Sequence, residues 1–171
     1  DMRRGRPSCH KAFPEALAIL AGDAMSIHAF SVLANSTALS DAQKLRLIAE
    51  LAEESGHHGM IAGQVLDMEQ EGRRDVTVDQ LKTMCAFKTG ALIRVACRMG
   101  CIAANATDEQ IKAADTYGSY LGLAFQIVDD ILDVTSTTDV LGKPVGSDAE
   151  ENKVTFVTLL GLEAAQKEAA A

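Results

Sequence analysis

Hydrophobic and polar positions along this chain repeat mostly with the period of an α-helix. Apolar residues recur three and four positions apart, which places them on one face of a helix and favours packing against a neighbour. The segments predicted to be helical on this basis are residues 11–35, 39–72, 78–104, 108–134 and 154–170. The alternation in VTFVT, at the start of the last segment, is too short to predict a strand. The pattern therefore indicates helices and no sheet.

Four of the glycines inside these predicted helices need a structural explanation. Gly56, Gly59 and Gly63 punctuate the second predicted helix, which suggests a bend or a close approach of another group to its backbone. Gly90 lies in the middle of the third, in the sequence KTG. A glycine in a helix interior costs about 1 kcal/mol relative to alanine, so a glycine at this position needs a reason beyond helix formation.

The composition supports a single all-α domain over residues 1–171, built as a bundle of long antiparallel helices. Of the 171 residues, 47% are hydrophobic, which is enough for a substantial core, and only three are proline. The net charge is −8, whereas a protein that binds nucleic acid needs a basic surface for the phosphates. Nucleic acid is therefore not expected as a partner.

The cysteines and the absence of a targeting pattern indicate a cytoplasmic protein. The cysteines are Cys9, Cys85, Cys97 and Cys101. Cys97 and Cys101 stand one helical turn apart, but a zinc site would need two more ligands, and His57 and His58 lie in another segment. Packing thiols in a reducing compartment explain the four better. We recognise no signal peptide, and we expect no apolar run long enough to cross a membrane.

An acidic stripe crosses an otherwise apolar helix in FQIVDDILDV, residues 125–134. Gln126, Asp129, Asp130 and Asp133 are spaced to lie on one helix face. One interpretation is a solvated face that happens to be acidic. A solvated face usually mixes charges, however, and stacked aspartates repel one another. Carboxylates that converge from one face are suited to Mg²⁺, which takes one or two carboxylates together with water and phosphate oxygens.

A magnesium site of this kind usually serves a phosphate, and basic residues are available for it. They occur before the first helix, ahead of Gly90 and in the loop after the acidic helix: Arg3, Arg4 and Arg6; Lys88 beside Thr89; and Lys143. Each group alone is weak evidence for a phosphate site, because an isolated lysine is usually solvated. The combination with the aspartates predicts a phosphate-binding site.

Several motifs together resemble one enzyme family. They are RRGRPSCHKAF, AILAGDAM, GQVLDMEQEG, KTGALIRVACRMG, LGLAFQIVDDILDV and LGKPVGSDAEENKVTFVTLLGLE, and they follow one another over almost the whole chain. Their wording is similar to that of the short-chain trans-prenyl diphosphate synthases, the farnesyl and geranylgeranyl diphosphate synthases. The resemblance implies an all-helical fold around a central cavity, usually as a homodimer.

The activity implied by the resemblance is a Mg²⁺-dependent condensation. Isopentenyl diphosphate would be joined to an allylic diphosphate, dimethylallyl or geranyl diphosphate. By position in the family motif, Asp129 would bind the metal directly, and Asp130 and Asp133 would act through water or hydrogen bonds. Thr89 and Gln126 would flank the reacting carbon, where their oxygens can stabilise positive charge.

The resemblance also implies which basic residues hold the two substrates. Lys88 and Lys143, with Arg3, would hold the allylic diphosphate, and Arg4 would hold isopentenyl diphosphate. For Lys153, a solvated side chain fits at least as well as a further phosphate contact.

The sequence departs from the family at its beginning. Members carry a first aspartate-rich motif just upstream of RRG, and here only Asp1 represents that acidic run. We therefore expect a fragment that lacks this motif and the final helices, and that is inactive by itself. The alternative is a non-catalytic subunit of a prenyl synthase complex. A class I terpene cyclase also uses DDxxD but has no reason to carry RRGRP, KTG and GKPVGSD together.

Overall fold

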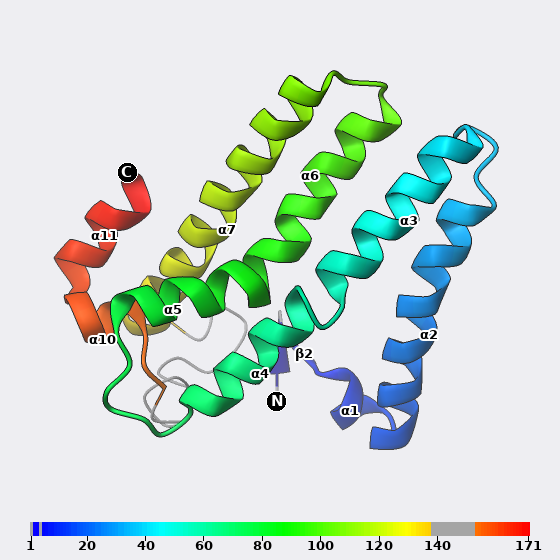
Figure 1. The fold of residues 1–171 in the computed structure, drawn as a ribbon. Helices are drawn as coiled ribbons and strands as arrows, with labels where there is room; N and C mark the ends of the chain where they lie inside the picture. The colour runs from blue at the N-terminus through cyan, green and yellow to red at the C-terminus, as the bar shows by residue number, and fades with distance from the viewer. Residues whose placement is uncertain (1, 4, 138–152) are drawn as a thin grey trace.

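The computed structural model describes residues 2–3, 5–137 and 153–171, and it confirms the predicted all-α class. The helices are α1 (Cys9–Ala12), α2 (Glu15–Ala34), α3 (Asp41–Ser55), α4 (Met60–Gln70), α5 (Val78–Cys85), a π-helix η1 (Ala86–Gly90), α6 (Ala91–Ala103), α7 (Asp108–Thr135), α10 (Phe156–Leu160) and α11 (Leu162–Ala170). Helices α2, α3, α6 and α7 lie side by side in that order, and α11 packs along the far side of α7 (Figure 1).

The expectation of no strands was wrong at the N-terminus. Two two-residue strands, β1 (Met2–Arg3) and β2 (Arg6–Pro7), pair antiparallel with Arg3 opposite Arg6. Gly5 in the turn has a φ of 73°, which glycine adopts without strain. Strands this short contain no alternation of apolar and polar residues, so the pattern could not reveal them.

Glycines and capping residues set the helix boundaries. The predicted helix 39–72 is divided into α3 and α4, because the chain bends between Gly56 and Gly59. A Cβ atom at Gly59 would lie 2.0 Å from the carbonyl oxygen of Glu54, so only glycine fits. The predicted helix 154–170 is likewise divided at Gly161, whose φ is 82°. Capping boxes begin α3, α5, α7 and α10 at Ser40, Thr77, Thr107 and Thr155.

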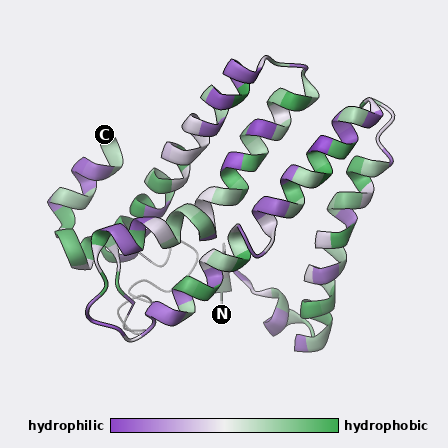
Figure 2. Cartoon of the chain, viewed as in Figure 1, coloured by the Kyte–Doolittle hydropathy of each residue, from purple (hydrophilic) through white to green (hydrophobic). Residues whose placement is uncertain are grey.

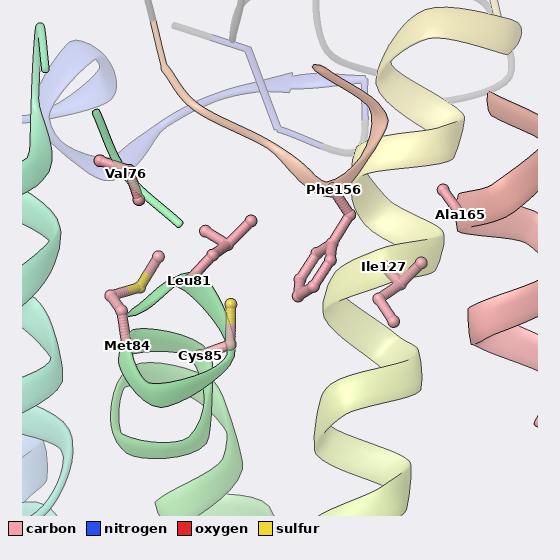
Figure 3. Close-up of a cluster of buried hydrophobic side chains, with 7 residues drawn as sticks. All are labelled: Val76, Leu81, Met84, Cys85, Ile127, Phe156 and Ala165. Atoms are coloured by element: carbon pink, nitrogen blue, oxygen red, sulfur yellow. The ribbon is translucent and has the colours of Figure 1, made fainter. Parts of the chain in front are cut away.

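Two hydrophobic clusters hold the bundle together. The larger joins α5, α7, α10 and α11 and consists of Val76, Leu81, Met84, Cys85, Ile127, Phe156 and Ala165. Figure 3 shows the ring of Phe156 between the side chains of α5 and Ile127 of α7. The smaller cluster joins α3, α6 and α7 through Leu47, Ile102 and Ile111. The larger cluster lies directly beside the acidic part of α7 and fixes that part in place.

A polar network also fastens α3, α6 and α7 to one another. The side chain of Arg98 is only 12% exposed, and its nitrogens lie 2.7 Å from Glu54, 2.6 Å from Asp115 and 2.7 Å from Glu50. Arg94 donates a second hydrogen bond to Asp115 at 3.0 Å. Burial acts to lower the pKa of Arg98, but the hydrogen bonds to Glu54 and Asp115 outweigh it and raise the pKa. The guanidinium is therefore permanently charged.

Helix α2 corrects the expectation that no segment is long and apolar enough to cross a membrane. It has 20 residues, and the most apolar stretch of 18 residues within it has a mean hydropathy of 1.6. None of the residues in this stretch is buried. Figure 2 shows hydrophobic residues along its length, and its only acidic residues are Glu15 and Asp23. Within the part of the chain that the structure describes, only α2 meets this criterion of length and composition. A packing helix of a larger assembly meets the same criterion.

Candidate functional site

The acidic part of α7 and the KTG segment face the same pocket. This pocket has a volume of about 340 Å³. Helices α4 and α5, η1, α7 and residues 153–155 line it: Asp67, Leu81, Met84, Cys85, Lys88, Thr89, Gln126, Asp129, Asp130, Lys153, Val154 and Thr155. Five residues singled out from the sequence as site residues are therefore brought together from two separate helices: Lys88, Thr89, Gln126, Asp129 and Asp130.

Lys88 is positioned by a carboxylate that the sequence did not single out. Its Nζ donates to Oδ2 of Asp67, which is 8% exposed and lies on α4. The two helices approach closely here, since a Cβ at Gly63 would lie 2.1 Å from the backbone nitrogen of Lys88. The expected close approach at Gly63 is thus confirmed. In the sequence, Asp67 could have been noticed only by its position, because it is an acidic residue one helical turn after Gly63 in the motif GQVLD.

A chain of hydrogen bonds connects η1, α7 and α10 along the wall of the pocket. The hydroxyl of Thr89 donates to Oε1 of Gln126 at 3.1 Å, and Nε2 of Gln126 donates to Oδ1 of Asp130 at 3.0 Å. The other carboxylate oxygen of Asp130 accepts from the backbone N–H of Phe156 at 2.8 Å. Both carboxylate oxygens of the buried Asp130 therefore have a hydrogen-bond donor, as a buried carboxylate requires. Through these two bonds Asp130 orients Gln126 and holds the start of α10 against α7.

Gly90 is explained by packing. A Cβ at Gly122 of α7 would lie 2.8 Å from the Cα of Gly90, so the two backbones touch. Gly90 ends the π-helix Ala86–Gly90, and π-helical turns often occur at functional sites. The contact with Gly122 brings Thr89 within hydrogen-bonding distance of Gln126. The glycine in KTG thus allows the site to form, whatever it contributes to phosphate binding.

The aspartates differ in their access to the pocket. Asp129 is half-buried and lines it, Asp130 lines it but is 5% exposed, and Asp133 is 2% exposed and is not among its lining residues. Over residues 2–3, 5–137 and 153–171, no group of three or more metal-ligating side chains is close enough to hold a metal ion. The donor set still suits Mg²⁺, because that ion takes one or two carboxylates and completes its shell with water and phosphate.

The thiol of Cys85 lies in the wall of the pocket but is not a nucleophile. Cys85 is 1% exposed. Burial raises the pKa of its thiol to about 12, and the carboxylates of Asp130 and Asp67 act in the same direction. A thiol with this pKa is protonated at neutral pH. The chemistry of the pocket therefore rests on its lysines, carboxylates and amide.

Some predicted site residues cannot be placed. Arg4 and Lys143 lie outside the described residues, as does Asp1. Arg3 is described in its backbone, as part of β1. Lys153, for which the sequence favoured a solvated side chain at least as much as a phosphate contact, is half-buried and lines the pocket.

Comparisons with known proteins show which proteins this chain is similar to. The profile of the polyprenyl synthetase family matches residues 1–171. Farnesyl diphosphate synthase of Escherichia coli is 47% identical over 172 residues, which cover 99% of this chain and 57% of that protein. Geranylgeranyl pyrophosphate synthase 7 of Arabidopsis thaliana is 43% identical over 95% of this chain and 48% of its own length. The chain therefore spans about half the length of these curated relatives.

A solved structure shares the arrangement of the helices. The geranyltransferase of Helicobacter pylori, complexed with magnesium and isoprenyl diphosphate, superposes with a TM-score of 0.89 at 36% identity. The superposition covers 99% of this chain and 55% of that one.

Proposed function

The chain belongs to the polyprenyl synthetase family, and from this premise we propose that the complete protein is a prenyl diphosphate synthase. It would condense isopentenyl diphosphate with an allylic diphosphate, dimethylallyl or geranyl diphosphate, to give farnesyl or geranylgeranyl diphosphate. The observation that carries the proposal is the convergence of Lys88, Thr89, Gln126 and Asp129 on one pocket. These residues supply a cation, neutral oxygen atoms and a carboxylate for an allylic diphosphate.

Lys88 is the proposed contact for the allylic diphosphate. An ammonium group has three donors, so Lys88 can keep its bond to Asp67 and still donate to a phosphate oxygen. Asp67 holds the ammonium at the wall and limits the conformational entropy lost when the substrate binds. Lys153 lines the same pocket and is a second proposed contact. Lys143 and Arg3 are proposed for the same diphosphate, and Arg4 for isopentenyl diphosphate, from the family motifs.

Asp129 is the proposed direct ligand of Mg²⁺, with Asp130 and Asp133 acting through water or hydrogen bonds. Bound Mg²⁺ would stabilise the negative charge that develops on the departing diphosphate. Asp130 keeps Asp129 in place by securing α7 to α10 through Phe156.

Thr89 and Gln126 are proposed to stabilise the reacting carbon. The allylic carbon–oxygen bond breaks with its electron pair leaving on the diphosphate, and positive charge develops on the carbon. The oxygens of Thr89 and Gln126, held 3.1 Å apart, present partial negative charge at the pocket wall. The double bond of isopentenyl diphosphate forms the new carbon–carbon bond, and the released diphosphate takes the proton that is then lost.

We further propose a cytoplasmic homodimer. The exposed apolar side chains of α2 support an interface with a second copy, because burying them there removes apolar surface from water. No observation favours the alternative of a non-catalytic subunit, since five of the predicted site residues converge on the pocket.

Replacing Lys88 with alanine in the complete protein tests the proposed substrate assignment. The affinity for the allylic diphosphate is expected to fall by about tenfold to a hundredfold, the loss of a hydrogen bond to a charged group, while that for isopentenyl diphosphate changes little. Isothermal titration of each substrate measures the two affinities. Lys112→Ala removes an exposed lysine of α7 outside the pocket and serves as the control. Equal losses for both substrates would contradict the assignment.

A further inference from the structure

A second hollow lies beside the candidate site and is basic. Its volume is about 600 Å³. Its lining comes from the connection between α4 and α5, from the segment that leads into α10 and from α10 itself: Gly72, Arg73, Arg74, Lys153, Val154, Thr158 and Leu159. No acidic residue lines it among the residues that the structure describes. In a protein with a net charge of −8, three basic side chains therefore line one hollow, and one of them, Arg73, is paired with Asp75.

The arginines of this hollow are arranged for binding. Nε and Nη2 of Arg73 donate to the two carboxylate oxygens of Asp75 at 2.9 and 2.8 Å. This bidentate pair fixes the plane of the guanidinium and leaves the N–H groups of Nη1 available. Arg74 is exposed and makes no hydrogen bond or ion pair with any residue that the structure describes. The same hollow is therefore bordered by the guanidinium of Arg73, which Asp75 orients, and by that of Arg74, which has no partner among the described residues.

The hollow and the candidate site share part of their walls. Lys153 and Val154 line both. The hollow therefore adjoins the candidate site at these two residues. Val154 and Leu159 add an apolar part to the wall, which can accept a short hydrocarbon chain.

We propose that the hollow bordered by Arg73, Arg74 and Lys153 is an anion-binding site for a diphosphate group, next to the candidate site and sharing Lys153 with it. Guanidinium groups bind phosphate oxygens bidentately, and two of them with an ammonium match the several charged oxygens of a diphosphate. The diphosphate is either inorganic or the head group of a prenyl diphosphate. Neither metal nor catalysis is required, so the site can exist even if the protein does not condense prenyl diphosphates.

Titration of inorganic diphosphate into the protein, with EDTA present to remove divalent metals, tests this site. The wild-type protein is expected to bind. Arg74→Ala is expected to weaken binding by about tenfold, the loss of one hydrogen bond to a charged group, and Arg74→Glu to abolish it. Because Arg74 is exposed, both variants should fold, and circular dichroism checks this. Arg46→Ala removes an exposed arginine of α3 outside the hollow and should bind like the wild type.

The outcomes separate this site from the candidate site and distinguish the two sources of diphosphate. Loss of metal-free diphosphate binding in Arg74→Glu assigns that binding to the hollow, because Arg74 does not line the candidate site. Tighter binding of farnesyl diphosphate than of inorganic diphosphate, again dependent on Arg74, would identify a prenyl diphosphate as the ligand. Equal affinity would identify the inorganic anion. No metal-free binding by the wild type, or binding that Arg74→Glu leaves unchanged, would overturn the proposal.

Discussion

Replacing Asp129 with alanine is expected to abolish the Mg²⁺-dependent binding of an allylic diphosphate to the complete protein. Asp129 is the half-buried carboxylate of α7 that lines the pocket, whereas Asp130 is engaged by Gln126 and Phe156 and Asp133 is buried away from the pocket lining. A bound metal contributes several kcal/mol of charge stabilisation, so turnover should fall by about a thousandfold or more. Titration of the diphosphate with and without Mg²⁺ measures the effect on binding.

Two further variants make this result specific to the carboxylate. Asp129→Asn keeps the size of the side chain but removes its charge, and it should lose the Mg²⁺-dependent part of binding as well. Glu109→Gln removes an exposed acid from the first turn of the same helix and should behave like the wild type. If Asp129→Ala retains its Mg²⁺-dependent affinity, the assignment of the metal to this carboxylate fails.

Replacing Arg98 with alanine should produce the largest loss of stability. The change leaves Glu50, Glu54 and Asp115 close together without the cation that joins α3, α6 and α7. Removing one partner from a fully buried ion pair costs about 3–5 kcal/mol of the free energy of unfolding, and for this partly buried network we expect about 2–3 kcal/mol. Urea denaturation at neutral pH measures this loss. Arg46→Ala is the matched control, because Arg46 is 47% exposed and reaches Glu50 only at 3.9 Å. A loss below about 1 kcal/mol, the value for a surface ion pair, would contradict the account.

The pH dependence of the same experiment gives an independent check. Burial alone would raise the pKa of Asp115, but hydrogen bonds from Arg98 and Arg94 outweigh it and hold the pKa below its usual range. A carboxyl whose pKa is lowered by folding stabilises the protein above its unfolded pKa, and this contribution disappears as the pH falls through the folded pKa. The gap in stability between wild type and Arg98→Ala should therefore narrow below about pH 4, near the unfolded pKa of aspartate.

Much of the fold could be predicted because helices leave a local pattern. The predicted segment 108–134 became α7 almost residue for residue, since its period and its capping residue Thr107 are both local features. The convergence of Lys88 and Thr89 with Gln126 and Asp129 was also predicted, though from the wording of family motifs. Spacing alone places residues on one helix face and says nothing of which face of another helix they meet.

What the sequence did not reveal depends on contacts between distant segments. Asp67 acquires its role only when Gly63 lets α4 approach Lys88, and Arg98 only when α3 and α7 bring three carboxylates around it. The strand pair at residues 2–7 is too short to leave a pattern. The exposure of α2 was missed because an apolar helix has the same sequence pattern whether it packs inside its own chain or against another molecule.

The most direct test of the proposed function is a condensation assay on the complete protein. Labelled isopentenyl diphosphate is incubated with dimethylallyl or geranyl diphosphate, with Mg²⁺ or with EDTA, and the prenyl products are separated by chain length. We expect a farnesyl or geranylgeranyl product that requires Mg²⁺ and is lost in Asp129→Ala. Failure of the folded protein to form any prenyl product with either allylic substrate would contradict the proposed synthase activity.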